Sequence, residues 1–363
     1  MSRWLKFVIF HYLCSHYNSL RQFIQHLSIM LGRSTNVVIL AISAMLATLL
    51  IGCSKPQRPY ITIETESLGT FLQMTLPASH PQEQIEQIIT EVDSLAKASM
   101  SIFHPESLLS RINRNETNVA DSHIVRNIEI AKRFYELSGG TYDITIKPLT
   151  DALGFGRDKQ IRSANIDSLL EFVGYEKISV EGSTIVKSDP RVQIDLNSIA
   201  KGYTVDLMAT RLEELGMTDY MVCIGGEIRC KGHNARGSRW SIGIETPYDS
   251  NMSGKSFEKI IYLEDCAVAT SGNYRRFYLT EDGRKVAHTI DPRTGESVIS
   301  ELLSATVVAP TCAEADAAAT MFMSLGSAAA PLAQRCATEY GWSYYFIYAD
   351  GDDYRIECSE DFL

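Results

Sequence analysis

Hydrophobic residues recur along the chain with two periods, which separate predicted strands from predicted helices. Residues 60–77 alternate between apolar and polar side chains, and this predicts two strands that turn near Gly69. Residues 82–99 carry isoleucine, valine and leucine at helical spacing, which predicts a helix. A second helix is expected over residues 122–137, ending at Gly139 and Gly140.

The rest of the chain mixes short strands and helices. A strand over residues 191–195 is expected to lead into a helix that runs to about Leu215. The remaining predicted elements are strands at 220–226, 240–247, 303–310, 342–349 and 353–358, and helices at 312–325 and 328–339. Because these elements follow no regular β-α-β order, the pattern predicts an α+β fold. No clear linker interrupts residues 60–363, so we expect one compact domain there.

The N-terminal part of the chain has the composition of a targeting signal. Residues 37–52 are apolar or small throughout, which is short for a membrane span and typical of a signal-peptide core. The run ends in LLIGC, which resembles a bacterial lipobox with Gly52 directly before Cys53. We therefore expect residues 1–52 to be removed, Cys53 to carry lipid and residues 53–59 to form a tether. An ordinary signal peptide or anchor with an incidental cysteine is the alternative.

The charged region before the apolar core is unusually long. A start at Met30 would give a signal of normal proportions, with Arg33 as its basic residue. We expect Met30 to be the true start. Two or three acyl chains on Cys53 would hold the protein at a membrane, whereas one alone is marginal.

Charge and cysteine content narrow the class of protein. The chain has 34 basic and 44 acidic residues, and removing four basic residues with segment 1–52 leaves 30 against 44, a net charge of −14. A domain this acidic argues against binding nucleic acid through a broad basic surface. A small anionic ligand needs only a local positive site. The cysteines form no CxxC pair, so we expect no zinc site, and both disulfides and buried thiols stay open as alternatives.

The sequence DLNSIAKGYTVD, residues 195–206, concentrates polar groups at the expected junction of strand and helix. Unpaired N–H groups at a helix start attract anions, and Lys201 adds a positive charge. Gly202 lets another group approach the backbone closely. We hypothesise a ligand site here, with Asp195 and Ser198 beside it. A capped helix with a solvated lysine is the plainer interpretation.

Two further segments carry candidate side chains for a ligand. Tyr142 and Asp143 follow the glycine pair, and they either present an aromatic face and a carboxylate to a ring system or begin an ordinary strand. His288 precedes residues 291–295, DPRTG, which are a strong turn signature. This histidine either lies beside a ligand or is structural.

The sequence CAEADAAATMF, residues 312–322, suggests a metal site. Asp316 and Thr320 are four residues apart, so they share one face of the predicted helix. Hard oxygen ligands beside small alanines suit Mg²⁺, which takes few protein ligands and keeps its other positions for water and phosphate. A buried threonine and a capping aspartate are the plainer interpretation.

Taken in order, five motifs resemble one known family. They are DLNSIAKGYTVD, IGGEIRCKG, VATSGNYRRF, HTIDPRTGE and ADAAAT, and SLGTFLQMTLP and SIFHPESLLSRIN fit its N-terminal segments. The sequence resembles the ApbE family, the FAD:protein FMN transferases, over roughly residues 60–350. The resemblance implies a T-fold-like α+β domain that binds FAD and Mg²⁺. It further implies transfer of FMN to a threonine hydroxyl of a target protein, with release of AMP.

The resemblance also implies roles for individual residues. FAD-contacting positions fall at Asp195, Lys201, Ile290, Thr141, Tyr142 and Asp143, and, in less similar segments, at Leu68 and Phe103. Metal positions fall at Ser198, Asp316 and Thr320. The target threonine must lose its proton, and His288 and Asp316 are both candidates to assist.

The sequence departs from the family pattern at four of its positions. Asn197 stands where glycine is common, and Ser198 stands where glycine, alanine or threonine is found, which affects the metal geometry if side-chain size matters. Leu68 replaces a frequent methionine. Phe103 replaces a frequent tyrosine and so keeps a stacking face but loses a hydroxyl.

Family members are exported, often as lipoproteins, which implies anchoring in the bacterial cell envelope with the catalytic domain facing the periplasm. The implied acceptors are flavoproteins of membrane redox complexes, such as sodium-pumping NADH:quinone reductase. A Mg²⁺-dependent FAD pyrophosphatase and a non-catalytic periplasmic FAD-binding lipoprotein are the competing functions. Retention of Asp316 and Thr320 favours catalysis over storage.

Overall fold

The structure, a computed structural model, describes residues 59–159, 161, 164–247, 257–273, 277–279, 285–351, 353–360 and 362. Contacts divide the chain into the units Met1–Gln57 and Arg58–Leu363, and the described residues all belong to the second. The expected signal segment 1–52, the start at Met30 and the lipidation site Cys53 lie outside the described residues, so they stay predictions.

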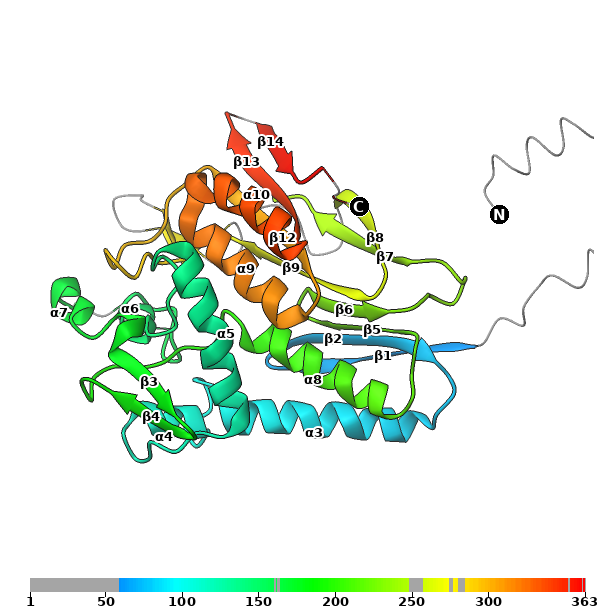
Figure 1. Ribbon diagram of the computed structural model, residues 1–363, viewed down its shortest axis with the longest axis horizontal. Helices are drawn as coiled ribbons and strands as arrows, with labels where there is room; N and C mark the ends of the chain where they lie inside the picture. Colours follow the sequence, from blue (N-terminus) through cyan, green and yellow to red (C-terminus); the bar gives the residue numbers. More distant parts are fainter. Residues whose placement is uncertain are drawn as a thin grey trace, which may run out of the picture. The chain divides into compact units, whose positions relative to one another are not determined.

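An eight-stranded sheet forms the centre of the second unit (Figure 1). Its strands, in spatial order, are β1 (Tyr60–Ser67), β2 (Thr70–Pro77), β5 (Tyr220–Ile224), β6 (Glu227–Lys231), β9 (Cys266–Gly272), β12 (Leu302–Ala309), β13 (Ser343–Asp350) and β14 (Asp353–Cys358). Every neighbouring pair is antiparallel. The turn between β1 and β2 is made by Leu68 and Gly69, whose φ angles of 51° and 75° suit a tight hairpin. The predicted strand pair is confirmed.

Helices pack against one face of this sheet (Figure 1). The longer ones are α3 (Gln82–Met100), α5 (Ser122–Ser138), α8 (Ala200–Glu214), α9 (Cys312–Leu325) and α10 (Ala329–Tyr340). Three shorter helices are α4 (Leu108–Asn113), which contacts α3, and α6 (Lys147–Ala152) and α7 (Ile166–Leu170), which contact each other. Asp121 caps α5, and Gly139 ends it with a φ of 63°. The helices predicted at 82–99, 122–137, 312–325 and 328–339 are confirmed as α3, α5, α9 and α10.

Side chains alternate between the two faces of the sheet, so each face has its own core. On the helix side the buried residues include Val222, Ile224, Ala267 and Phe346. On the other side Cys223, Ile228, Val268 and Ile347 pack against β7 (Trp240–Glu245) and β8 (Phe257–Leu263), which form an antiparallel pair. The fold therefore has three layers, and the predicted α+β class is confirmed.

The strand predicted over residues 191–195 is wrong. In this segment Gln193 forms one isolated bridge to Ile146, and no strand is present. The side chain of Asn113 accepts a hydrogen bond from Ile194 N at 2.7 Å and donates one to Ile194 O at 2.8 Å. The asparagine side chain thus forms the hydrogen bonds to the Ile194 N–H and C=O groups that a neighbouring strand would otherwise form.

Residues 141–146 do not form a strand either, so that alternative fails. They make bends and turns before α6, and two further pairs, β3 (Ile178–Glu181) with β4 (Thr184–Lys187) and β10 (Phe277–Leu279) with β11 (Lys285–Ala287), lie outside the main sheet. The six described cysteines are free thiols. Within the described ranges, no helix has both the length and the apolar character needed to cross a membrane.

Candidate functional site

Helices α8 and α9 meet at a glycine, and their contact gathers charged side chains. A Cβ on Gly202 would lie 2.2 Å from the carbonyl oxygen of Cys312, so only glycine permits this approach. Gly202 N donates a hydrogen bond to Asp316 Oδ2 at 2.9 Å. The neighbouring Lys201 pairs with Glu227, the first residue of β6. We call Lys201, Gly202, Glu227 and Asp316 the α8–α9 cluster.

Burial and charge set the protonation of this cluster. Asp316 and Glu227 are only 3% and 4% exposed. Burial raises the pKa of Asp316 to about 7, although the charge of Lys201 acts to lower it. Burial acts to lower the pKa of Lys201, but the carboxylates of Glu227 and Asp316 outweigh it and raise that pKa. Lys201 therefore keeps its charge, and one cation serves two carboxylates.

The loop before α8 links the cluster to Tyr142. Ser198 Oγ donates a hydrogen bond to Tyr142 OH at 2.9 Å. Burial raises the pKa of Tyr142, and the nearby charge of Asp316 raises it further. Thr141 Oγ1 lies 3.0 Å from Ser324 Oγ, which is near the far end of α9. The structure thus brings four predicted site residues, Thr141, Tyr142, Ser198 and Asp316, to the surroundings of α9.

Two other predicted carboxylates are held by the loops around them. Asp143 Oδ1 accepts hydrogen bonds from the N and Oγ1 atoms of Thr145, both at 2.7 Å, and its Oδ2 accepts one from Tyr175 N at 2.8 Å. Asp195 Oδ1 accepts a hydrogen bond from Asn197 N at 2.8 Å. Burial raises the pKa of both carboxyl groups. In this structure Asp143 shapes its own loop, and Asp195 shapes the approach to α8.

The apolar residues predicted to contact FAD lie at element ends. The backbone of Leu68 is left-handed. This conformation costs about 1–3 kcal/mol in a residue other than glycine, and residues that adopt it are often found at ligand sites. Its N–H donates to Asp93 Oδ1 at 3.0 Å, which holds the turn against α3. Ile290 is buried beside Leu149 of α6, and Phe103, after the end of α3, is 45% exposed.

Thr320 lies one turn after Asp316 on α9, so the two share a face as predicted. Its Oγ1 lies 3.2 Å from Ser271 Oγ on β9. His288 follows β11, and its ring lies edge-on to Phe155 with the ring centroids 6.3 Å apart.

Asp316 and Thr320 on α9 and Ser198 in the loop before α8 carry oxygens of the type that binds magnesium. The Asp316 carboxylate and the hydroxyls of Thr320 and Ser198 are hard donors of the kind that Mg²⁺ takes in small numbers. Glu227 Oε2 is buried and has no hydrogen-bond partner among the described residues, so the cluster contains an unsatisfied acceptor. The described ranges contain no group of three His, Cys, Asp or Glu side chains suited to a metal. A magnesium ion here would therefore need hydroxyl, water and substrate oxygens beside its one carboxylate.

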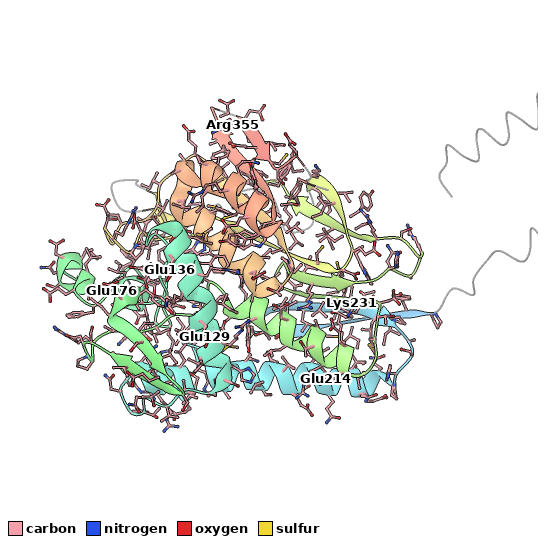
Figure 2. The ribbon with its side chains drawn as sticks, in the orientation of Figure 1. Glu129, Glu136, Glu176, Glu214, Lys231 and Arg355 are labelled. Carbon is pink, nitrogen blue, oxygen red and sulfur yellow. The ribbon has the colours of Figure 1, made fainter. Side chains whose placement is uncertain are left out.

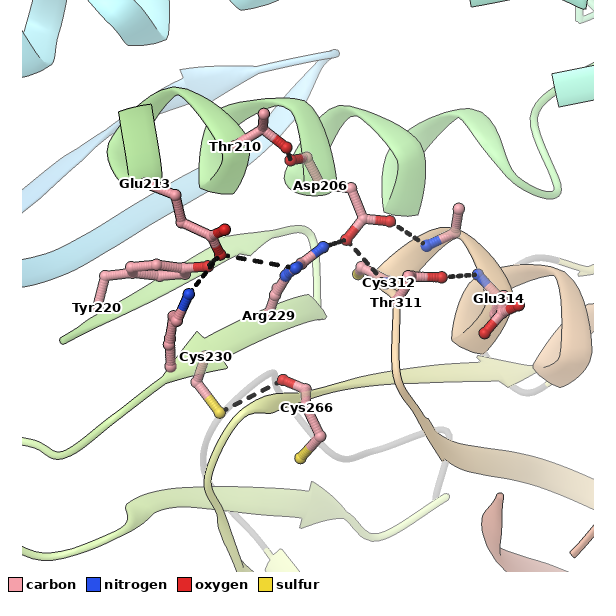
Figure 3. A network of polar contacts seen from close by, with 12 residues as sticks. Asp206, Thr210, Glu213, Tyr220, Arg229, Cys230, Cys266, Thr311, Cys312 and Glu314 are labelled. Carbon is pink, nitrogen blue, oxygen red and sulfur yellow. Dashed lines mark hydrogen bonds and ion pairs between the residues drawn. The ribbon is translucent and has the colours of Figure 1, made fainter. Parts of the chain in front are cut away.

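A second polar network fixes the start of α9 (Figure 3). Asp206 of α8 accepts hydrogen bonds from Cys312 N at 3.0 Å and from Ala313 N at 2.9 Å. Arg229 of β6 donates to the same carboxylate at 2.7 Å. These contacts satisfy N–H groups of the first turn of α9 and tie that turn to both α8 and β6. They lie one turn before Asp316 and so position it.

Sequence reasoning missed Glu227 and Asp206 as members of the site. Glu227 directly follows Gly225 and Gly226, the two glycines of the IGGE motif, and Asp206 ends the motif DLNSIAKGYTVD. Two signals were available: Glu227 stands beside a glycine turn, and Asp206 lies one helical turn after Gly202. Their partners Lys201 and Arg229 lie on other elements, which sequence spacing alone does not show.

The chain is similar in sequence and in fold to known flavin transferases. The profile of the ApbE family matches residues 68–340. A relative named FAD:protein FMN transferase from Haemophilus influenzae is 35% identical over 305 residues, covering 78% of this chain and 86% of the relative. One of the same name from Vibrio cholerae is 34% identical over 288 residues, covering 77% and 85%.

Two solved structures have the same fold. The flavin transferase ApbE from Vibrio cholerae superposes with a TM-score of 0.75 at 30% identity, covering 84% of this chain and 98% of that one. The apo form of the flavinyl transferase ApbE from Pseudomonas stutzeri gives a TM-score of 0.74 at 25% identity, covering 83% and 95%.

Proposed function

The chain belongs to the ApbE family of flavin transferases, and we propose that it transfers FMN from FAD to a threonine hydroxyl of a protein acceptor and releases AMP. The observation that carries this proposal is the α8–α9 cluster, in which Gly202 N holds the buried Asp316 carboxylate at 2.9 Å. Asp316 and Thr320 share one face of α9, and a storage protein has no need of such a pair of metal-type ligands.

The start of α8 is suited to a pyrophosphate. The N–H groups of Ala200, Gly202 and Tyr203 in this turn already have partners, so Lys201 is the group that would attract the anion. Lys201 carries its charge in the same turn and is held in place by Glu227. Asp195 and Tyr142 border the loop that leads into this turn, and Leu68, Phe103, Thr141, Asp143 and Ile290 are the further proposed FAD contacts.

The transfer breaks the phosphoanhydride bond of FAD and forms a phosphoester bond between the FMN phosphorus and the threonine Oγ. AMP leaves with the bridging oxygen. We assign Ser198, Asp316 and Thr320 as the residues that would hold Mg²⁺, which when bound neutralises charge on the phosphate oxygens. Gly202 N fixes the Asp316 carboxylate, and the Asp206 network fixes the helix that carries it.

The threonine proton must pass to a base as the new bond forms. Asp316 is one candidate, because its carboxylate lies in the α8–α9 cluster beside Lys201. His288 is the second candidate, from the turn after β11. Comparing the pH dependence of transfer by His288→Asn with that of the unaltered chain separates them, because only loss of the true base removes the pH step.

We also propose that Cys53 carries lipid and anchors the protein in the bacterial cell envelope, with the catalytic domain facing the periplasm. The LLIGC sequence at residues 49–53 supports this anchoring. The proposed acceptors are flavoproteins of membrane redox complexes of the sodium-pumping NADH:quinone reductase type. The acidic charge of the domain supports a partner other than nucleic acid.

The test is incubation of the protein with FAD, Mg²⁺ and a flavin-carrying subunit of such a reductase. Flavin fluorescence on the subunit after denaturing electrophoresis, with AMP released in equal amount, supports the proposal. A subunit with its target threonine changed to alanine is the matched control and should stay unlabelled. Release of AMP and free FMN without labelling indicates a pyrophosphatase, and FAD binding with neither product indicates storage.

A further inference from the structure

The outer face of β8 carries large apolar side chains in an exposed position. Phe257, Ile260 and Tyr262 are 51%, 54% and 52% exposed, whereas Ile261 and Leu263 on the same strand are fully buried against the main sheet. A strand with one face in solvent normally carries polar side chains there. A group of exposed apolar side chains on one face therefore indicates a contact surface.

A basic segment adjoins this face. Residues 231–239, KGHNARGSR, contain two arginines, one lysine and one histidine and no acidic residue, and they lead directly into β7. His233, Arg236 and Arg239 are exposed. His233 and Arg239 share the carboxylate of Glu264, at 3.3 and 3.4 Å, so one acidic group serves two basic ones. Lys231 pairs with Glu213 at 3.4 Å, whereas Arg236 makes no ion pair within the described residues, so Arg236 and Arg239 are the basic side chains that this segment presents to solvent.

The chain enters the domain at the same place. Tyr60 begins β1, its ring centroid lies 6.2 Å from that of Trp240, and its hydroxyl donates to His233 O at 2.8 Å. Trp240 is the first residue of β7 and pairs with Leu263 of β8. Figure 1 shows the start of β1 and the β7–β8 pair on one side of the molecule, and Figure 2 shows Lys231 on that side. The entry point, the basic segment and the apolar face are thus contiguous.

The length of the tether decides what this surface meets. Residues 54–59 separate the proposed lipidated Cys53 from Tyr60, and six extended residues reach at most about 20 Å. A lipid on Cys53 would therefore hold this side of the domain against a membrane surface. We propose that the outer face of β8 and the segment 231–239, together the β8 surface, rest on an anionic phospholipid bilayer. This inference rests on the anchoring given under the proposed function.

The chemistry of the β8 surface suits the interfacial region of a bilayer. Tyr262 and Phe257 are aromatic side chains of the type enriched at membrane interfaces, and Ile260 adds an apolar side chain between them. Arg236 and Arg239 would face anionic headgroups. The main sheet separates β8 from α8 and α9, so the α8–α9 cluster would face away from the bilayer. Docking would thus present the cluster to acceptor proteins.

Vesicle binding by an unlipidated chain tests this inference. A chain that begins at Ser54 keeps the whole unit Arg58–Leu363, which contains every described hydrophobic cluster, and therefore folds. It should sediment with phosphatidylglycerol vesicles at low salt and much less with phosphatidylcholine vesicles. The double change Ile260→Ser with Tyr262→Ser should weaken phosphatidylglycerol binding about tenfold, because apolar area no longer leaves water. Arg236→Gln with Arg239→Gln should abolish the preference for the anionic lipid.

Val186→Ser is the matched control, since Val186 on β4 is also exposed, at 41%, and should bind vesicles like the unaltered chain. Absence of vesicle binding by the unaltered chain, or an equal loss in the control, overturns the inference. So does a dimer in ultracentrifugation that Ile260→Ser dissociates, because a second copy then covers the face. FMN transfer in solution is measured on the same samples. If the unaltered chain binds vesicles but transfers no FMN, the proposed function fails and the membrane contact stands.

Discussion

Gly202 N donates a hydrogen bond to Asp316 Oδ2 at 2.9 Å, so the first turn of α8 holds the carboxylate of α9 directly. The absence of a side chain at residue 202 makes the contact possible, because a Cβ there would lie 2.2 Å from Cys312 O and 2.8 Å from Asp316 Cβ. One glycine thus serves both the packing of the two helices and the position of the carboxylate.

Gly202→Ala should therefore lower the free energy of unfolding by about 1–3 kcal/mol, as overpacking of a close helix contact does. Urea unfolding followed by circular dichroism measures this change. Thr210→Ala, on the exposed face of the same helix, is the control and should change stability little. Equal stability of Gly202→Ala and the unaltered chain would show that α8 and α9 separate easily.

The pairing of Lys201 with Glu227 makes a second prediction. Lys201→Met leaves the buried Glu227 carboxylate without its cation and should reduce stability by about 2 kcal/mol. The loss is smaller than for a fully buried pair because 36% of the Lys201 side chain is exposed. Adding Glu227→Gln to Lys201→Met should recover part of the loss in a double-mutant cycle. Strictly additive changes would contradict a direct interaction.

Asp206 is predicted to stabilise the start of α9. Asp206→Ala removes the acceptor of the Cys312 and Ala313 N–H groups and leaves Arg229 without its partner, so stability should fall by about 1–3 kcal/mol. The control is Glu213→Ala, because Glu213 lies at the more exposed edge of the same network. Thermal unfolding compares the two, and a larger effect of Glu213→Ala would reverse the assignment.

Local sequence patterns predicted the parts of this fold that depend on local chemistry. The alternation of residues 60–77 and the glycine at 69 specify a hairpin without help from the rest of the chain. The apolar helix 312–325 is likewise clear, and its spacing placed Asp316 and Thr320 on one face. Elements whose burial follows the local period were thus predictable.

The errors and omissions all involve partners distant in sequence. Residues 191–195 have the apolar pattern of a strand. However, the side chain of Asn113, 81 positions away, forms the hydrogen bonds to Ile194 N and O that a neighbouring strand would form. The interactions of Lys201 with Glu227 and of Asp206 with Arg229 cross from α8 to β6. No spacing rule within one element reveals such pairs, so the site was predicted only in part.

Lys187 gives a pH-dependent prediction. Burial lowers the pKa of this lysine to about 8 from 10.5. Between these pH values the unfolded chain is protonated at Lys187 and the folded chain is neutral, so the unfolded state binds more protons and stability rises with pH. The difference in unfolding free energy between the unaltered chain and Lys187→Gln should therefore grow in favour of the unaltered chain from pH 8 to 10.5.

Lys132→Gln serves as the control for this titration, since the Lys132 side chain is 62% exposed. Urea unfolding at several pH values supplies the comparison. A difference that stays constant, or that shrinks as the pH rises, would mean that Lys187 is not desolvated in the folded chain.

The central claim is that Asp316 supports transfer of FMN. Asp316→Ala should lose FMN transfer by roughly 100-fold or more, because it removes the one carboxylate among the assigned metal-binding residues. Glu314→Ala removes a carboxylate from the same helix, where Glu314 pairs with Arg133 at 2.7 Å, and should keep transfer close to that of the unaltered chain. FAD binding should survive in both variants, since Lys201 and the start of α8 are unchanged.

The most direct measurement is the rate at which flavin fluorescence appears on an acceptor subunit carrying the target threonine, with Mg²⁺ and again with EDTA. The predicted result is labelling by the unaltered chain and by Glu314→Ala with Mg²⁺, none with EDTA, and almost none by Asp316→Ala in either condition. Labelling by Asp316→Ala at the rate of the unaltered chain, or labelling by the unaltered chain that persists in EDTA, would contradict metal-assisted transfer at the α8–α9 cluster.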